Sequence, residues 1–239
     1  MNFVLVHGGF HGGWCWRLVA DKLRAQGHQV SCPTQTGLGE RRHLISNQLT
    51  LDLFVQDIVH HLESEDLREV VLLGHSFGGL SISGAAERVP GRIRHLVYLD
   101  ALILQPHQTP FGVLPPDVVQ ARRQGCAERH GVRCFMPPPV TAFGIPPDHP
   151  LADWVQERLT PQPACLYDSP LTLSAPPGQG LPRTYVACTA PALTSVASSQ
   201  AWVRQQPDWR WRELATGHDA MITDPDGVSE VLLQIGQAG

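Results

Sequence analysis

A serine flanked by glycines, at the end of an apolar run, constrains this chain more than any other feature of the sequence. The stretch "VVLLGHSFGGL" (70–80) joins a run typical of a buried strand to a small-residue segment that predicts a helix. Gly74 and Gly78 lack the Cβ atoms that would clash in a sharp strand-to-helix turn. Such a turn exposes the serine oxygen beside the free N–H groups of the helix N-terminus. The sequence therefore predicts Ser76 as a nucleophile, with a structural turn serine as the alternative.

Apolar runs alternate with helical patterns along most of the chain. Runs typical of buried strands occupy residues 3–7, 28–33, 69–74, 92–100, 183–189 and 209–214. Segments that predict helices occupy residues 14–27, 50–65, 77–89 and 224–236. This alternation predicts an α/β fold, with a mostly parallel six-stranded sheet and helices on both faces. The 239 residues suffice for one such domain.

The middle of the chain breaks this alternation. Residues 103–182 hold most of the 21 prolines, yet aromatic residues are scattered among them, so the segment is not a flexible linker. We predict a proline-rich cap insertion over the carboxyl ends of the strands, where α/β proteins place ligands. The core would then comprise residues 1–102 and 183–239, and the cap residues 103–182.

Composition argues against several classes of partner. The net charge of −4 comes without a basic stripe, so nucleic acid is not an expected partner. No apolar run approaches the roughly 20 residues that span a bilayer, and the first strand-like run starts at Phe3, so we expect neither membrane insertion nor a signal peptide. The six cysteines lack metal-site spacing, which favours reduced thiols and a cytoplasmic protein. We expect no metal and no cofactor, and a homodimer is one option for the assembly.

A serine hydroxyl is a poor nucleophile unless a base takes its proton. Among 12 histidines, His218 lies between the last expected strand and the last expected helix, at the sheet edge that holds Ser76. We predict His218 as the base, the alternative being a loop histidine with a structural role. His7 and His75 follow their strands within glycine turns, where they more readily orient backbone or pack.

An ester-cleaving serine also needs two backbone N–H groups that converge on the developing oxyanion. One is expected from Phe77, directly after the serine, and the other from the loop "HGGFHGGW" (7–14). A glycine-rich turn that only joins a strand to a helix is the alternative for this loop. Residues of the loop are also candidates for substrate contact, with plain core packing as the alternative: Gly8, Phe10, His11 and Trp14.

The pieces "VLVHGGFHGGWCW", "VVLLGHSFGG", "HLVYLDA" and "GHDAMITDP" resemble the α/β-hydrolase superfamily. Within it they are similar to small esterases related to plant methylesterases and hydroxynitrile lyases, and to bacterial carboxylesterases of that group. The resemblance implies the α/β-hydrolase fold, Gly9 and Phe77 as oxyanion donors, and a pocket walled by the cap.

Two departures from this pattern matter. The plant members carry the carboxylate of the catalytic triad after the strand that corresponds to residues 183–189, but "APALTSV" follows that strand here. Asp100, at the end of the 92–100 run, lies at the correct sheet edge and is the favoured acid. Weaker candidates for the acid are Asp168, Asp208 and Asp219. A serine–histidine dyad without an acid is the remaining option.

The second departure concerns cyanohydrin cleavage. The related lyases use a threonine in the oxyanion loop and a lysine after the catalytic histidine, whereas this chain has Gly8 and Asp219 there. We therefore predict a cofactor-independent serine carboxylesterase that acts on small-molecule esters. The alternatives are a lyase or another non-hydrolytic catalyst on the same fold, and a non-catalytic ligand receptor.

Overall fold

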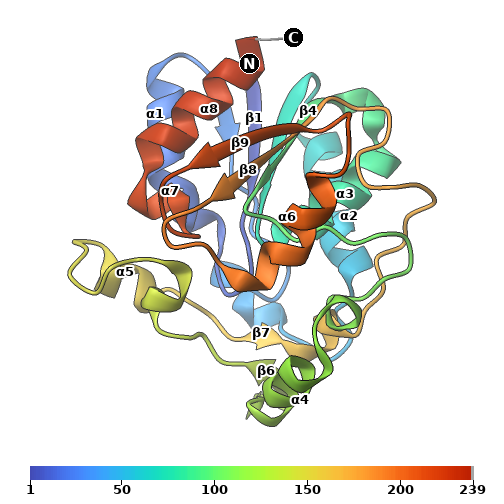
Figure 1. Ribbon diagram of the computed structural model, residues 1–239, viewed down its shortest axis with the longest axis vertical. Helices are drawn as coiled ribbons and strands as arrows, with labels where there is room; N and C mark the ends of the chain where they lie inside the picture. Colours follow the sequence, from blue (N-terminus) through green and yellow to red (C-terminus); the bar gives the residue numbers. More distant parts are fainter. Residues whose placement is uncertain (238–239) are drawn as a thin grey trace.

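Six parallel strands form the centre of the computed structural model, which describes residues 1–237 (Figure 1). In sheet order they are β2 (Gln29–Ser31), β1 (Asn2–Val6), β3 (Val70–His75), β4 (Ile93–Leu99), β8 (Arg183–Cys188) and β9 (Arg210–Leu214). Every neighbouring pair is parallel, so the predicted sheet is confirmed and is entirely rather than mostly parallel. Because all strands run the same way, their carboxyl ends meet at one edge.

Helices cover both faces of this sheet, as the sequence predicts. Helices α1 (Arg17–Ala25) and α8 (Pro225–Gln237) pack on one face, while α2 (Leu51–Ser64), α3 (Gly78–Arg88) and α6 (Ala197–Val203) pack on the other (Figure 1). Side chains alternate along β1: Phe3 faces the first layer and Val4 the second. The four central strands, β1, β3, β4 and β8, are buried on both faces, which explains why they read as largely apolar runs, whereas the edge strands β2 and β9 are partly exposed.

Short elements connect these layers. They are α7 (Ala220–Thr223) and the 3₁₀ turns η1 (Gly13–Trp16), η2 (Gly39–Leu44), η3 (Pro90–Arg92) and η7 (Thr194–Val196). Within residues 1–237, the helices are all too short or too polar to cross a membrane.

Most of residues 103–182 lies below the carboxyl ends of the strands, and the last stretch, which includes Ser174 and Gly178, returns alongside α3 to the start of β8 (Figure 1). This segment contains the helices α4 (Pro116–Gln124) and α5 (Ala152–Gln156), and a small antiparallel sheet of β5 (Ala127–Arg129), β6 (Val132–Phe135) and β7 (Gln162–Pro163). It also contains the 3₁₀ turns η4 (Phe111–Val113), η5 (Val140–Phe143) and η6 (Ala164–Tyr167). Tyr167 packs into the α2–α3 layer and Phe143 into the α1–α8 layer. Residues 103–182, called the cap below, therefore close the end of both layers.

Candidate active site

Ser76 occupies a sharp turn between β3 and α3. Its φ of +52° lies in the left-handed region, which a non-glycine residue rarely adopts. Its N–H donates to the carbonyl of Leu99 at 3.1 Å, which ties the turn to β4. A Cβ on Gly74 would lie 2.6 Å from the Gly78 oxygen, and one on Gly78 would lie 2.6 Å from the His7 oxygen. Both glycines of the motif are therefore required sterically, and the strain at the serine is held by the surrounding backbone.

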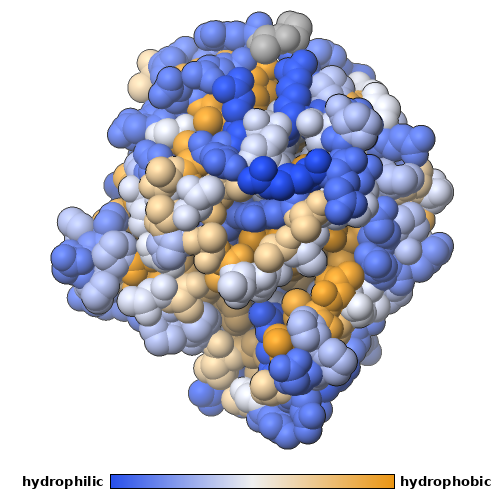
Figure 2. Space-filling view, viewed as in Figure 1, coloured by the Kyte–Doolittle hydropathy of each residue, from blue (hydrophilic) through white to orange (hydrophobic). Residues whose placement is uncertain are grey.

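A cavity of about 350 Å³ opens above Ser76. Ser76 and His218 both line it, and the cap supplies the facing wall with aromatic side chains such as Phe143 and Tyr167. Apolar residues gather where the cap meets the core (Figure 2). The cavity can therefore hold an apolar molecule of modest size against the serine.

His218 lies in the loop after β9, and its ring contacts the carboxylate of Asp100. The Nδ1 atom of His218 lies 2.6 Å from Oδ2 of Asp100, and both side chains are almost completely buried. The other oxygen of Asp100, Oδ1, accepts from Gln200 Nε2 at 2.9 Å and from the Cys188 N–H at 3.3 Å. The ends of β3 and β4 and the loop after β9 thus bring Ser76, Asp100 and His218 together at one edge of the sheet.

The other aspartates considered from the sequence are occupied elsewhere. Asp208 is exposed and pairs with Arg183, and Asp168 pairs with Arg123. Asp219 directly follows His218, but its carboxylate oxygen Oδ2 contacts His11 Nε2, whereas the Nδ1 atom of His218 contacts Asp100.

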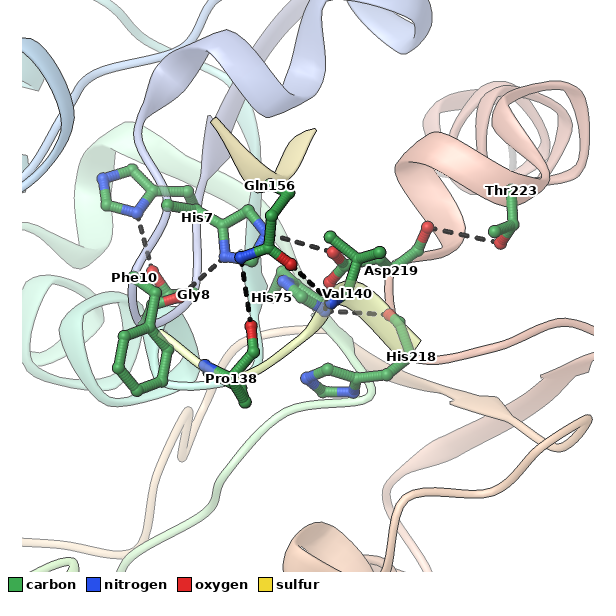
Figure 3. A network of polar contacts seen from close by, with 12 residues as sticks. His7, Gly8, Phe10, His75, Pro138, Val140, Gln156, His218, Asp219 and Thr223 are labelled. Carbon is green, nitrogen blue, oxygen red and sulfur yellow. Dashed lines mark hydrogen bonds and ion pairs between the residues drawn. The ribbon is translucent and has the colours of Figure 1, made fainter. Parts of the chain in front are cut away.

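Two buried neutral histidines hold backbone carbonyls of the site (Figure 3). His7 Nε2 accepts the Gln35 N–H at 3.0 Å, so its Nδ1 carries the proton and donates to the Gly8 carbonyl at 2.8 Å. His75 Nε2 donates to the His218 carbonyl at 2.9 Å. Burial lowers the pKa of His7 to about 3, and burial followed by the nearby His218 lowers the pKa of His75 well below 6.5. Both rings therefore act as fixed neutral donors at physiological pH.

A third buried histidine, His11, has acceptors on both ring nitrogens. Its Nδ1 lies 2.6 Å from the Gly9 carbonyl and its Nε2 lies 3.0 Å from Oδ2 of Asp219. Both nitrogens must donate, so the ring is an imidazolium paired with a carboxylate. Burial alone lowers the pKa of His11, but the Asp219 charge and these hydrogen bonds outweigh it, so the pKa is raised. Burial alone would raise the pKa of Asp219, but the positive charge and hydrogen bond of His11 outweigh burial, so the pKa of Asp219 is lowered.

The peptide between Gly9 and Phe10 is held at both ends. His11 holds its carbonyl, and Gln162 Oε1 accepts its N–H at 3.1 Å. A Cβ at Gly9 would lie 2.2 Å from Gln162 Oε1, so the cap glutamine fits only against glycine. Gln162 is completely buried, and no pattern in the sequence connects this cap residue with a loop 152 positions away.

The cap also touches the loop of His218 through backbone atoms. The Asp219 N–H donates to the Phe143 carbonyl at 2.9 Å. Gly144 has a φ of +78°, and a Cβ there would lie 2.6 Å from the Cα of Gly217. These two glycines allow the cap turn and the histidine loop to lie in direct backbone contact.

The remaining predicted contact residues divide into two groups. Gly9, Phe10 and His11 line the cavity. Gly8 and Trp14 do not line it: a Cβ on Gly8 would lie 2.8 Å from the Ser76 Cβ, and Trp14 stacks on His11 with ring centroids 5.4 Å apart. A role for Gly8 and Trp14 in substrate contact therefore stays a prediction.

Three groups of the site have the spacing of metal ligands. Atoms of His75, His218 and Asp219 that could bind a metal lie within 4.8 Å of one another. A metal on His218 would either displace Asp100 from Nδ1 or occupy Nε2, the nitrogen that would accept a proton from Ser76. Metal binding there and base function at His218 are therefore mutually exclusive.

Asp219→Asn is expected to destabilise the fold in a pH-dependent way. Breaking a buried ion pair typically costs about 3–5 kcal/mol. The stability that the raised pKa of His11 contributes is fully present below pH 6.5 and is lost as pH rises through the folded-state pKa. The lowered pKa of Asp219 contributes stability above pH 3.8 that is lost only in stronger acid. Urea unfolding should therefore show a larger deficit in the free energy of unfolding at pH 6 than at pH 9.

Asp226→Asn is the matched control, because Asp226 is exposed and pairs with Lys22 at the surface. It should follow the wild type at both pH values. A deficit in Asp219→Asn that is equal at pH 6 and pH 9 would contradict the charged pair.

Comparisons with known proteins agree with this architecture. The alpha/beta hydrolase family model matches residues 3–231. A carbendazim hydrolyzing esterase from Nocardioides sp. (strain SG-4G) is 35% identical, covering 98% of this chain and 99% of its own. Methylesterase 1 from Arabidopsis thaliana is 27% identical, covering 98% and 95% of the two chains. The solved structure of an extracellular alpha/beta-hydrolase from a Paenibacillus species superposes with a TM-score of 0.80 at 23% identity, over 98% of both chains.

The resemblance seen in the sequence is thereby confirmed over nearly the whole chain, including the cap. The likeness to the Paenibacillus structure supports the fold, and the two sequence relatives support the kind of reaction. This chain belongs to the alpha/beta hydrolase family, in the group of carboxylic ester hydrolases that contains these esterases.

Proposed function

We propose that this chain is a cofactor-independent serine carboxylesterase that cleaves small-molecule esters through an acyl-enzyme. The observation that carries the proposal is the buried contact of 2.6 Å between His218 Nδ1 and Asp100 Oδ2, beside a strained serine that shares a cavity with His218. An oriented histidine next to an exposed serine hydroxyl is the arrangement that activates serine as a nucleophile.

In the proposed first half-reaction, Ser76 Oγ attacks the ester carbonyl and His218 Nε2 takes the serine proton. Asp100 keeps the other proton of His218 on Nδ1, which leaves Nε2 free to accept, and stabilises the imidazolium that forms. His218 then donates its new proton to the leaving alkoxide. Water repeats the sequence on the acyl-enzyme and releases the acid.

The negative charge of the tetrahedral intermediate would be met by the N–H groups of Gly9 and Phe77. Phe77 precedes the first turn of α3, where helix N–H groups point outward without intrahelical partners. Gly9 is placed by the peptide that His11 and Gln162 hold. Donors that are fixed before the reaction stabilise the charge without having to reorganise, which favours the transition state.

Hydrolysis is favoured over cyanohydrin cleavage by the direction of one side chain. Asp219 stands where the related lyases have a lysine, and its buried carboxylate contacts His11 and does not line the cavity. The position therefore supplies no positive charge that could stabilise a leaving cyanide.

Covalent labelling tests the proposal directly. Phenylmethanesulfonyl fluoride should add one group per chain, on the peptide that contains Ser76, and should abolish p-nitrophenyl butyrate hydrolysis at the same rate. Ser195 also lines the cavity, so Ser195→Ala is the matched control and should be labelled normally. The proposal fails if the adduct forms on Ser195, or if the unlabelled protein releases no p-nitrophenol.

A further inference from the structure

Arg122 brings a positive charge to the wall of a largely apolar cavity. It lies on α4 of the cap and lines the same cavity as Ser76 and His218. The neighbouring cap wall is aromatic: Phe135 and Tyr167 pack edge to face, with ring centroids 4.8 Å apart. A partly buried guanidinium among such rings is poorly hydrated, so an anion that reaches it is bound more strongly than in water.

The neighbouring charges leave Arg122 without a carboxylate. Arg123 takes the nearby Asp168, with Nη1 3.1 Å from Oδ2, and lies over the ring of Phe111 instead of lining the cavity. Across residues 1–237, no carboxylate oxygen lies within the 4.0 Å of an ion pair from the Arg122 guanidinium. Asp100 and Asp219 stand behind the histidines of the site, each with its own partner.

The ring of Tyr167 lies between Arg122 and the residue next to Ser76. The guanidinium carbon lies 5.7 Å from the ring centroid of Tyr167. The Tyr167 ring in turn lies 5.2 Å from the ring of Phe77, the residue next to Ser76. Because Ser76, Arg122 and Tyr167 line the same cavity, a molecule whose ester reaches Ser76 can place a second group against Arg122 across an apolar spacer that lies along Tyr167.

We infer that the preferred substrates are esters that carry a second, ionised carboxylate about one aromatic ring away from the scissile bond, and that Arg122 binds this carboxylate. The inference rests on the proposed esterase function and names its substrate class. Guanidinium and carboxylate match in geometry and form paired charge-assisted hydrogen bonds. Such contacts correspond to a preference of about 10- to 100-fold over a neutral ester of the same shape.

The test compares kcat/KM within two pairs of esters of matched shape. One pair carries the charge on the acyl side: monomethyl terephthalate against methyl 4-methylbenzoate. The other carries it on the alcohol side: 4-carboxyphenyl butyrate against 4-methylphenyl butyrate. The wild type should prefer the charged ester in at least one pair by about 10- to 100-fold. Arg122→Gln, which keeps length and loses charge, should abolish that preference, and Arg122→Lys should restore part of it.

Arg123→Gln is the matched control, because it removes the adjacent charge outside the cavity, and it should retain the preference of the wild type. Equal kcat/KM values within both pairs, or a preference that survives in Arg122→Gln, would overturn the role of Arg122. A protein that hydrolyses p-nitrophenyl butyrate but none of the four esters would overturn the substrate class, whereas failure on p-nitrophenyl butyrate as well would refute the proposed esterase function.

Equilibrium binding of a carboxylate tests whether Arg122 forms an anion site, independently of ester hydrolysis. In Ser76→Ala protein, 4-methylbenzoate should bind about 10- to 100-fold more weakly once Arg122→Gln is added, as measured by calorimetry. Equal affinity with and without Arg122→Gln would refute the anion site even if esters are hydrolysed.

Discussion

Replacing Ser76 by alanine is expected to lower kcat/KM for p-nitrophenyl butyrate by about 10⁴-fold or more. The variant loses the oxygen that is proposed to form the acyl-enzyme, while the cavity and the proposed oxyanion N–H groups remain. Alanine has the same Cβ as serine, so the backbone at φ +52° meets no new clash. Purified protein and a spectrophotometric assay are sufficient, with thermal unfolding to show that the variant is folded.

Ser195→Ala controls for loss of any hydroxyl from the cavity and should keep the wild-type rate within about twofold. A Ser76→Ala enzyme that retains more than a tenth of the wild-type kcat/KM would show that another group starts the reaction.

Asp100→Asn is expected to lower kcat by about 10⁴-fold, with a much smaller change in KM. Oδ1 of Asp100 faces two donors, Gln200 Nε2 and the Cys188 N–H, so the amide oxygen of asparagine must take that place. The amide NH₂ then faces His218 Nδ1 and forces the tautomer that carries its proton on Nε2. A histidine protonated on Nε2 cannot accept the serine proton, although the side chain has the same size.

Asp208→Asn and Asp168→Asn are the controls for the acid, since both were candidates from the sequence and both pair with arginines outside the site. Neither should lower kcat more than about threefold. If Asp100→Asn keeps kcat within tenfold of the wild type, His218 works without an oriented acid, and the dyad becomes the better description.

The sheet and its helices could be predicted because their signals are local. Apolar runs bounded by glycines and polar turns coincide with the six strands of the sheet to within one or two residues. The helix expected at residues 50–65 begins where Thr50 accepts the Leu53 N–H at 3.2 Å. The position of Asp100 at the sheet edge of the active site could also be predicted, because Asp100 ends a strand-like run and the carboxyl ends of parallel strands share one edge.

Other parts of the site depend on contacts between distant segments. The pairing of Gln162 with the Phe10 N–H joins the cap to the first loop, and the direction of the Asp219 side chain depends on a buried His11 some 208 positions away. Arg122 and Arg123 are adjacent and chemically identical in the sequence, yet only Arg122 lines the cavity. These assignments follow from how the cap and the loops pack against one another, which no periodicity in the sequence determines.

The direct backbone contact between Gly144 and Gly217 has a consequence for engineering this enzyme. A cap grafted from a relative would bring a new pocket shape, but it would also replace the neighbour against which the His218 loop rests. Any bulkier residue at either glycine would push the loop away from Asp100. Exchange of the whole cap would therefore change the substrate pocket and the position of His218 at the same time. Changes of specificity are better sought by substituting single residues of the cavity wall.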